Sequence, residues 1–229
     1  MWGDDERVTY RVSYQPYEYQ YRPPVQTGGL QFSEEEKKHL IMAIGALTLA
    51  FTLFSIRVFR LPLFTSIILS LVVACTAFLL HEFGHKIIAQ RYGCWAEFRA
   101  WPFGLLFAII SGYIGWLFAA PGAVYIRGHL SREENGKVSA AGPLMNIGVA
   151  SILLPVLFFF PDIIDEIWYL VWMLCYLNVF IGGFNLIPFP PLDGSKIIKW
   201  NPVIWLVMGI ILGFYLVLLW SPSLLFSLV

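Results

Sequence analysis

The sequence predicts an all-α polytopic membrane protein with about five transmembrane helices. Of its 229 residues, 58% are hydrophobic and 13% are charged, whereas soluble domains are about 25% charged. Uncharged stretches recur along the chain, and each approaches or exceeds the roughly 20 apolar residues that a helix needs to cross a bilayer. These stretches are Leu40–Ile56, Leu61–Leu80, Trp101–Ile126, Val138–Pro161, Ile167–Leu192 and Trp200–Val229. A metal-binding sequence pattern follows the second stretch directly and places ionisable groups at membrane depth.

Residues 1–38 are predicted to form a polar, tyrosine-rich tail, and residues 39–229 the membrane domain. Hydrophobic and polar residues alternate within the tail, which is typical of short strands. Prolines interrupt this pattern, so the tail is either partly ordered or a small hairpin packed over the membrane domain. Ser33 and Glu36 have the spacing of a capping box, and we therefore expect the first helix to start near Glu34.

Charge and cysteine content narrow the range of functions. The 15 Lys and Arg residues balance 15 Asp and Glu residues, so nothing indicates nucleic-acid binding. Cys75, Cys94 and Cys175 form no CxxC pair, and those in apolar runs are expected to act as small hydrophobic residues. The first forty residues lack the apolar core of a signal peptide.

The metal-binding pattern is HEFGH at residues 81–85. Positions i and i+4 of a helix lie one turn apart on one face. His81 and His85 can therefore reach a single ion, with Glu82 beside them as a general base. Ionisable residues in a membrane span cost roughly 2.5–3.5 kcal/mol each on insertion scales, which favours a functional explanation. The alternative is a pair of histidines hydrogen-bonded in a helix bundle, but such a pair needs no adjacent buried glutamate.

The strongest candidate for a third ligand is Asp193. Catalytic zinc sites usually have three protein ligands and a water molecule, and Asp193 is the only carboxylate between Glu166 and the C-terminus. It ends the run FNLIPFPPLDG at residues 184–194, whose prolines cannot continue a helix. Irregular backbone of this kind is tolerated at membrane depth where it is buried in protein or lines a wet cavity. The alternative is that Asp193 caps the next helix.

Three motifs in this order closely resemble the site-2 protease family of intramembrane zinc metalloproteases. They are HEFGH at 81–85, AGPLMN at 141–146 and FNLIPFPPLDGSKI at 184–197. The resemblance implies one zinc ion held by His81, His85 and Asp193, with Glu82 as the catalytic base. It also implies that Asn185 helps to bind the substrate or the oxyanion, for which a simple hydrogen bond to the backbone is the alternative.

The AGPLMN segment is expected to serve helix packing rather than chemistry. Its alanine and glycine residues allow helices to approach closely, and Asn146 can form a hydrogen bond across a helix interface.

Residues 101–126 cannot form a single crossing. The stretches Val138–Pro161 and Ile167–Leu192 are joined by a short acidic segment, so they form a helical hairpin whose two ends share one membrane face. If Asp193 meets the two histidines, residues 86–137 must begin and end on that face. We therefore expect a re-entrant or short-hairpin segment around residues 101–126, with bends at Gly112, Gly115 or Pro121–Gly122. The resemblance implies membrane-associated strands in this segment, and AAPGAVYI at 119–126 looks like one. Its extended edge could pair with an unwound substrate.

Positive charges predict the orientation in the membrane. Loops near the motif are rich in basic residues, whereas the opposite loops carry two arginines and three acids. The positive-inside rule therefore places the active site and the N-terminal tail at the cytoplasmic face of the cell membrane. The basic residues counted near the motif are Lys86, Arg91, Arg99, Arg127, Arg132, Lys137, Lys196 and Lys199.

The expected activity is hydrolysis of peptide bonds within transmembrane segments of membrane-protein substrates. The expected partners are a substrate's transmembrane helix and the lipid bilayer, and the sequence leaves the oligomeric state open. The rival hypothesis is a non-proteolytic metal-binding membrane scaffold or chaperone built on the same fold. A chaperone derived from a protease would be expected to have lost Glu82 or a ligand, and all of them are present.

Overall fold

The computed structural model describes residues 30–116, 118–160 and 165–220. Five of the helices in these ranges are long and apolar enough to cross a membrane, which confirms a polytopic, predominantly helical membrane protein. Large apolar side chains such as Ile41, Phe64 and Ile152 are 72%, 75% and 73% exposed, as expected for surfaces that face lipid. The five spans are Glu34–Phe59, Leu63–Arg91, Arg132–Phe159, Ile167–Asn185 and Pro202–Trp220.

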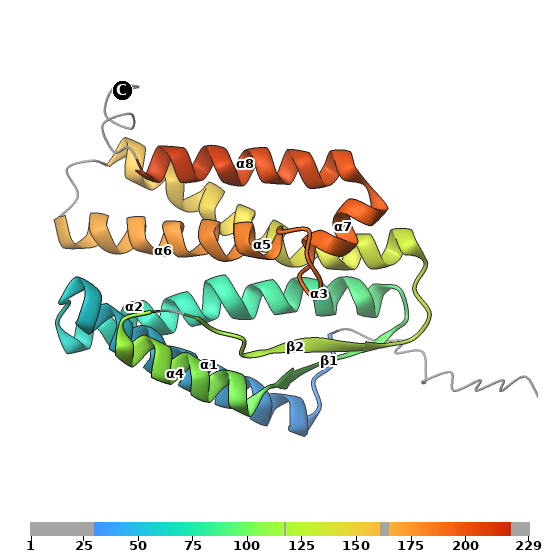
Figure 1. The fold of residues 1–229 in the computed structure, drawn as a ribbon, viewed down its shortest axis with the longest axis horizontal. Helices are drawn as coiled ribbons and strands as arrows, with labels where there is room; N and C mark the ends of the chain where they lie inside the picture. Colours follow the sequence, from blue (N-terminus) through green and yellow to red (C-terminus); the bar gives the residue numbers. More distant parts are fainter. Residues whose placement is uncertain (1–29, 117, 161–164, 221–229) are drawn as a thin grey trace, which may run out of the picture.

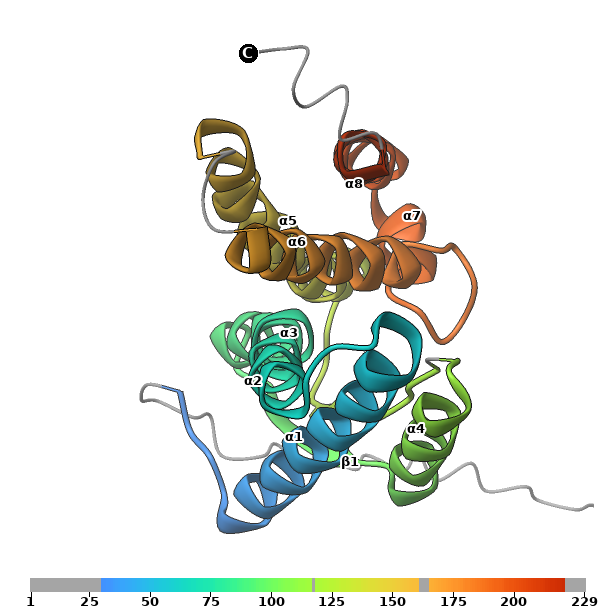
Figure 2. The ribbon, with the colours of Figure 1, turned by 90° about the vertical axis from the view of Figure 1, so that its left-hand side faces the viewer.

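The helices lie in two groups on either side of the motif-bearing helix (Figures 1 and 2). One group contains α5 to α8, and the other contains α1, α4 and a two-stranded sheet. The second span is a continuous helix made of α2, a π-helical segment η2 and α3. The elements are α1 (Glu34–Phe54), η1 (Ser55–Phe59), α2 (Leu63–Val73), η2 (Ala74–Leu79), α3 (Leu80–Arg91), β1 (Trp95–Ala100), α4 (Pro102–Ile114), β2 (Gly122–Arg127), α5 (Arg132–Phe159), α6 (Asp165–Asn185), α7 (Gly194–Trp200) and α8 (Pro202–Trp220).

The segment between α3 and α5 is re-entrant, as the parity of the crossings predicts. Helix α4 has 13 residues, about 20 Å at 1.5 Å per residue, which is too short for a hydrocarbon core about 30 Å thick. The chain turns back at Gly115, whose φ of 95° belongs to the left-handed region that favours glycine. It returns as β2, which pairs antiparallel with β1. The bend at Gly115 is confirmed, and Gly112 lies inside α4 and is no bend. The strand expected at residues 119–126 is found at Gly122–Arg127.

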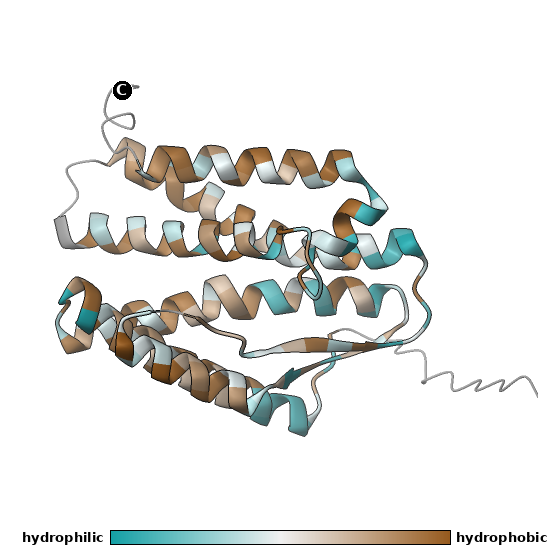
Figure 3. Ribbon diagram, in the orientation of Figure 1, coloured by the Kyte–Doolittle hydropathy of each residue, from teal (hydrophilic) through white to brown (hydrophobic). Residues whose placement is uncertain are grey.

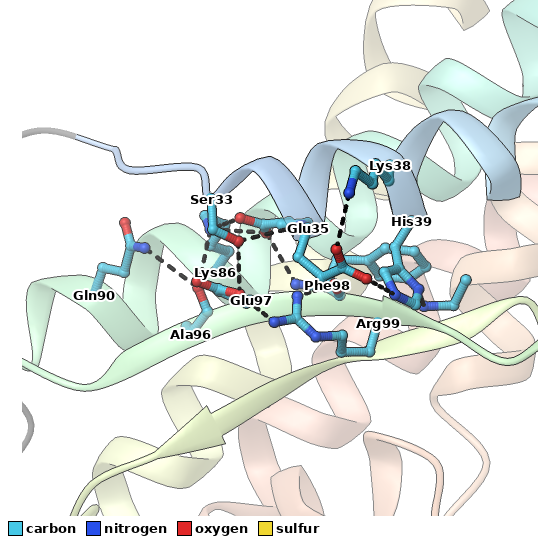
Figure 4. A network of polar contacts seen from close by, with 12 residues as sticks. Ser33, Glu35, Lys38, His39, Lys86, Gln90, Ala96, Glu97, Phe98 and Arg99 are labelled. Atoms are coloured by element: carbon cyan, nitrogen blue, oxygen red, sulfur yellow. Dashed lines mark hydrogen bonds and ion pairs between the residues drawn. The ribbon is translucent and has the colours of Figure 1, made fainter.

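Side chains from α1 and α3 occupy the outer edge of β1 (Figure 4). The Phe98 N–H donates to Glu36 Oε1 at 2.9 Å, and the Ala100 N–H donates to His39 Nδ1 at 3.1 Å. The Ala96 carbonyl accepts from Lys86 Nζ at 2.9 Å and from Gln90 Nε2 at 3.3 Å. At least one outward backbone group of each of Ala96, Phe98 and Ala100 is therefore already paired.

Lys86 and Glu36 form a fully buried ion pair between α3 and α1. Lys86 Nζ lies 2.8 Å and 2.6 Å from the two Glu36 carboxylate oxygens, and both side chains are 0% exposed. With its third bond to Ala96, the ammonium group has all three of its donors satisfied. The count of Lys86 as a loop charge is therefore wrong, because this residue lies within α3 and its charge is neutralised in the interior.

The predicted capping box at the start of α1 is half formed. The helix begins at Glu34, as expected, and the Ser33 hydroxyl accepts from the Glu36 N–H at 3.1 Å. The Glu36 side chain does not return to the cap, because both of its oxygens bind Lys86 and one also accepts from Phe98. The strand-like pattern predicted within residues 1–29 lies outside the described residues.

Candidate metal centre

The centre lies between α3, α5 and the loop that joins α6 to α7. His81 and His85 project from α3, and Asp193 ends the loop, which reaches from the end of α6 toward α3 (Figure 1). Hydrophilic residues gather along this part of α3 and at the end of the bundle that carries α7 (Figure 3). All three side chains are buried, with exposures of 3% for His81 and 8% for His85 and Asp193.

The three side chains converge on one point. Asp193 Oδ2 lies 3.1 Å from His85 Nε2 and 3.4 Å from His81 Nε2, and the two Nε2 atoms lie 3.1 Å apart. One ligand atom from each residue falls within 4.8 Å of the others. The structure thus brings together residues more than a hundred positions apart in the sequence, as the predicted ligand set requires.

Hydrogen bonds at the far side of each ring fix the tautomers of the two histidines. His85 Nδ1 lies 2.8 Å from the Val138 carbonyl, which can only accept. His81 Nδ1 lies 2.7 Å from Asn146 Oδ1, and the Asn146 amide nitrogen donates to the Ala77 carbonyl at 2.9 Å. Both Nδ1 atoms must therefore carry a proton, so each imidazole in its neutral form presents the lone pair of its Nε2 atom.

This donor set fits a zinc ion. Two lone-pair nitrogens and a carboxylate oxygen, which are all acceptors, lie together in a buried space, so a cation is needed to offset their repulsion. Imidazole and carboxylate ligands suit Zn²⁺, and two histidines with one carboxylate match the three protein ligands typical of catalytic sites.

Gly142 on α5 leaves the room that the ion needs. A Cβ atom at this position would lie 2.4 Å from His85 Nε2 and 2.6 Å from His81 Nε2. Any side chain would therefore collide with the ligand atoms. The interpretation of AGPLMN as a packing segment was incomplete, because Gly142 and Asn146 both contact the histidines.

Asp193 does not cap the following helix. It occupies the residue before α7, but its side chain makes no capping hydrogen bond and turns toward the histidines instead. Asp193 lies outside the five spans. The carboxylate therefore faces the two Nε2 atoms and is available as a ligand.

Glu82 and Asn185 lie beside the metal ligands in one cavity. Glu82 is 8% exposed, and its Oε2 accepts a hydrogen bond from the Val124 N–H of β2 at 3.1 Å. The Asn185 amide nitrogen donates to the Ile181 carbonyl at 3.0 Å. The backbone hydrogen bond that was the alternative for Asn185 is thus present, and its Oδ1 is recorded in no hydrogen bond within the described residues.

The cavity has a volume of about 860 Å³ and extends from the metal ligands between α1 and α6. On the α6 side, Trp172, Tyr176 and Phe180 line it and stack on one another, with ring centroids 5.4 Å and 6.2 Å apart. On the α1 side it is lined by Leu47, Phe51 and Phe54. The cavity next to the ligands is therefore lined mainly by apolar side chains.

The outer edge of β2 faces this cavity. Val124 is paired with Phe98, and both N–H groups point away from the neighbouring strand, so they form a non-hydrogen-bonded pair. By the same alternation, the backbone groups of Gly122 and Ile126 also point outward, and all three residues line the cavity. In the described part of the chain, Glu82 supplies the one recorded side-chain bond to this edge.

Sequence reasoning missed the residues that support His81 from behind. Asn178 on α6 accepts from the Asn146 amide at 3.2 Å and donates to Thr76 Oγ1 at 3.3 Å. Thr76 and Ala77 belong to the π-helical segment η2, immediately before the motif, and π-helical turns are frequent at functional sites. An asparagine inside the apolar run at 167–192 was the available signal, because a buried amide needs partners.

Comparison with known proteins gives several related zinc metalloproteases. The chain is 38% identical over 192 residues to "Putative zinc metalloprotease MJ0611" of Methanocaldococcus jannaschii, an alignment that covers 81% of this chain and 95% of that protein. It is 33% identical over 120 residues to "Zinc metalloprotease MJ0392" of the same organism, covering 52% of this chain and 30% of that protein. It is 28% identical over 164 residues to "Putative zinc metalloprotease YwhC" of Bacillus subtilis, covering 62% and 71%.

No family model matches the chain, and no solved structure matches it.

Proposed function

Because the chain belongs to the family of zinc metalloproteases represented by these relatives, we propose that it hydrolyses peptide bonds within transmembrane segments of membrane-protein substrates. It would act as an enzyme of the site-2 protease type. One observation carries the proposal: the side chains of His81, His85 and Asp193 border an apolar cavity between spanning helices, beside the outer edge of β2. A scaffold would need neither the buried glutamate nor the open edge.

The metal ligands and Glu82 would have separate roles in peptide hydrolysis. His81, His85 and Asp193 would hold the zinc ion, which when bound polarises the scissile carbonyl and lowers the pKa of the attacking water to about 7. Glu82 accepts the proton that this water loses and delivers it to the nitrogen of the leaving amine.

Asn185 would stabilise the oxyanion that forms on the scissile carbonyl. It lines the same cavity, and rotation of its side chain would exchange the Ile181 carbonyl for the substrate oxygen. Removing a donor of this type costs roughly 2.7–4 kcal/mol of transition-state stabilisation in other hydrolases.

The substrate must unwind near the cleaved bond, because a helix engages its carbonyl groups in i→i−4 hydrogen bonds. The outer edge of β2 offers the unwound segment new backbone partners by strand addition. The apolar cavity between α1 and α6 accommodates adjoining residues of the substrate's transmembrane segment. We therefore expect substrates with Gly, Pro or Asn near the cleavage site.

The active site would face the cytoplasm. After Lys86 is removed from the count, seven basic residues remain near the site, against Arg57 and Arg60 at the opposite end. The positive-inside rule thus still favours this orientation.

The proposal is tested by cleavage in reconstituted vesicles. The purified chain, a model transmembrane substrate with a central Asn–Gly pair, and zinc are combined, and the products are mapped by mass spectrometry. We expect a cut inside the apolar segment that a chelator blocks. The Glu82→Gln variant should retain zinc and cleave about 10²–10⁴-fold more slowly. Cleavage confined to soluble loops, or normal activity of Glu82→Gln, would contradict the proposal.

A further inference from the structure

The proposed general base is already engaged in the resting structure. Glu82 Oε2 accepts the Val124 N–H at 3.1 Å, and Glu82 is 8% exposed. A partly buried N–H group that loses its acceptor costs about 1–3 kcal/mol. The Glu82 carboxylate therefore cannot leave Val124 freely, because the strand would be left with an unpaired amide.

The same N–H group is the one that an added strand needs. The Val124 N–H points away from β1, from the middle of the outer edge of β2. A strand added to this edge continues the antiparallel or parallel ladder through the outward groups of Gly122, Val124 and Ile126. One carbonyl of the added strand must then accept from Val124, where Glu82 now binds.

We propose that the Glu82–Val124 hydrogen bond is a latch that a substrate opens when its unwound segment pairs with β2. This inference rests on the proposed function and adds a way in which that function is controlled. The substrate carbonyl replaces Glu82 as the acceptor, so no amide is left unpaired. Release of Oε2 frees the Glu82 side chain to turn toward the water once a strand is in place.

The latch selects for substrates by their conformation. A segment that remains helical keeps its own carbonyls bonded and offers no acceptor to Val124. Such a segment can enter the apolar cavity without releasing the base. Cleavage would therefore depend on unwinding of the substrate in two ways. Unwinding exposes the scissile carbonyl, and it provides the acceptor that releases Glu82.

The test is a double-mutant cycle on peptide binding by inactive chains. Glu82→Ala removes the acceptor, whereas Glu82→Gln retains a side-chain oxygen that can accept from Val124. Each is combined with Val124→Ala, which retains the backbone N–H, or with Val124→Pro, which removes it. Proline is tolerated here because this N–H takes no part in the ladder with β1. The probe is a fluorescent leucine–alanine transmembrane peptide with a central Asn–Gly pair, titrated into zinc-loaded protein in nanodiscs.

We expect Glu82→Ala to bind the peptide about 2- to 10-fold more tightly than Glu82→Gln in the Val124→Ala background, the effect of one hydrogen bond. In the Val124→Pro background the two affinities should become equal. Equal affinities in both backgrounds, or a ratio that persists without the N–H, would overturn the latch while leaving the proposed function intact. A peptide that no variant binds and that the unmodified chain does not cleave would overturn the proposed function, and the latch with it.

Hydrogen–deuterium exchange supplies a second measurement that does not depend on the proline variant. Residues 122–127 should exchange faster in Glu82→Ala than in Glu82→Gln, and addition of the peptide should restore their protection. Exchange that is the same in both variants would overturn the latch.

Discussion

The two outer edges of the β1–β2 sheet have different surroundings. On β1, an outward backbone group of each of Ala96, Phe98 and Ala100 is bonded to a side chain from α1 or α3. On β2, the outward edge lies along an apolar cavity of about 860 Å³, and Glu82 is its recorded side-chain partner among the described residues. One short sheet thus has one closed edge and one available edge.

This difference separates a structural role from a functional one. Unpaired strand edges are a liability, because they template pairing with other chains, and proteins usually cover them. Here the covered edge anchors the sheet to the helix that bears the metal ligands. The edge that remains available lies next to the ligands. Variants at β1 should therefore change stability, and variants at the β2 side should change chemistry or substrate binding.

The largest effect is expected at the covered edge, from Lys86→Met. Removing one partner of a buried ion pair costs about 3–5 kcal/mol, because the other charge remains buried without compensation. Thermal unfolding in detergent should show a lower melting temperature, and the double variant Glu36→Gln/Lys86→Met should recover most of it. If Lys86→Met unfolds at the same temperature as the unmodified chain, the buried ion pair does not anchor the sheet to α3.

Gly142→Ala is expected to reduce zinc affinity by at least about 100-fold, more than the usual effect of a residue behind a ligand. Its Cβ would lie 2.4 Å from His85 Nε2. Gly148→Ala on the same helix is the matched control, because a Cβ there has no atom within 4 Å, and its zinc affinity should be unchanged. Competition with a chromogenic chelator measures both, and equal affinities would contradict the ligand geometry.

Asn146→Ala should lower zinc affinity by about 10- to 100-fold, because it removes the acceptor that holds the proton on His81 Nδ1. Asn146→Asp retains an acceptor and serves as the matched variant. If its affinity falls as far as that of Asn146→Ala, the tautomer of His81 does not depend on this contact.

Ile126→Pro is expected to have the smallest effect, a roughly 2- to 10-fold rise in KM from one lost hydrogen bond to the substrate. Ile126→Ala removes the same side chain but retains the outward N–H, so the difference between the two variants isolates backbone pairing. Cleavage kinetics in vesicles measures it. A KM that is equal in the two variants would argue against strand addition at this position.

The sequence was sufficient to predict the spans and the convergence of His81, His85 and Asp193. A run of apolar residues has few alternatives in a membrane, and the placement of Asp193 with the two histidines required the re-entrant path of residues 101–126. The contacts of Gly142, Asn146 and Asn178 were not predictable in the same way. They depend on which faces of η2, α5 and α6 meet, and this information is distributed across three helices.

Lys86 illustrates the same limit. Its position directly after the motif suggested a loop charge, and its burial depends on Glu36, fifty residues earlier in the chain. A local pattern cannot show that two charges at such a distance neutralise each other.

Disulfide trapping tests most directly whether the available edge receives the substrate. Ala123 and Arg99 are cross-strand partners on β2 and β1. Each is replaced by cysteine in an inactive Glu82→Ala chain whose three native cysteines are replaced, and the peptide carries a single cysteine scanned through its centre. An added strand lies about 4.8 Å from β2, within the Cα separation of about 4.4–6.8 Å that a disulfide bridges, and about twice as far from β1. The account predicts trapping by Ala123→Cys but not by Arg99→Cys, and equal trapping by both, or trapping by Arg99→Cys alone, would contradict it.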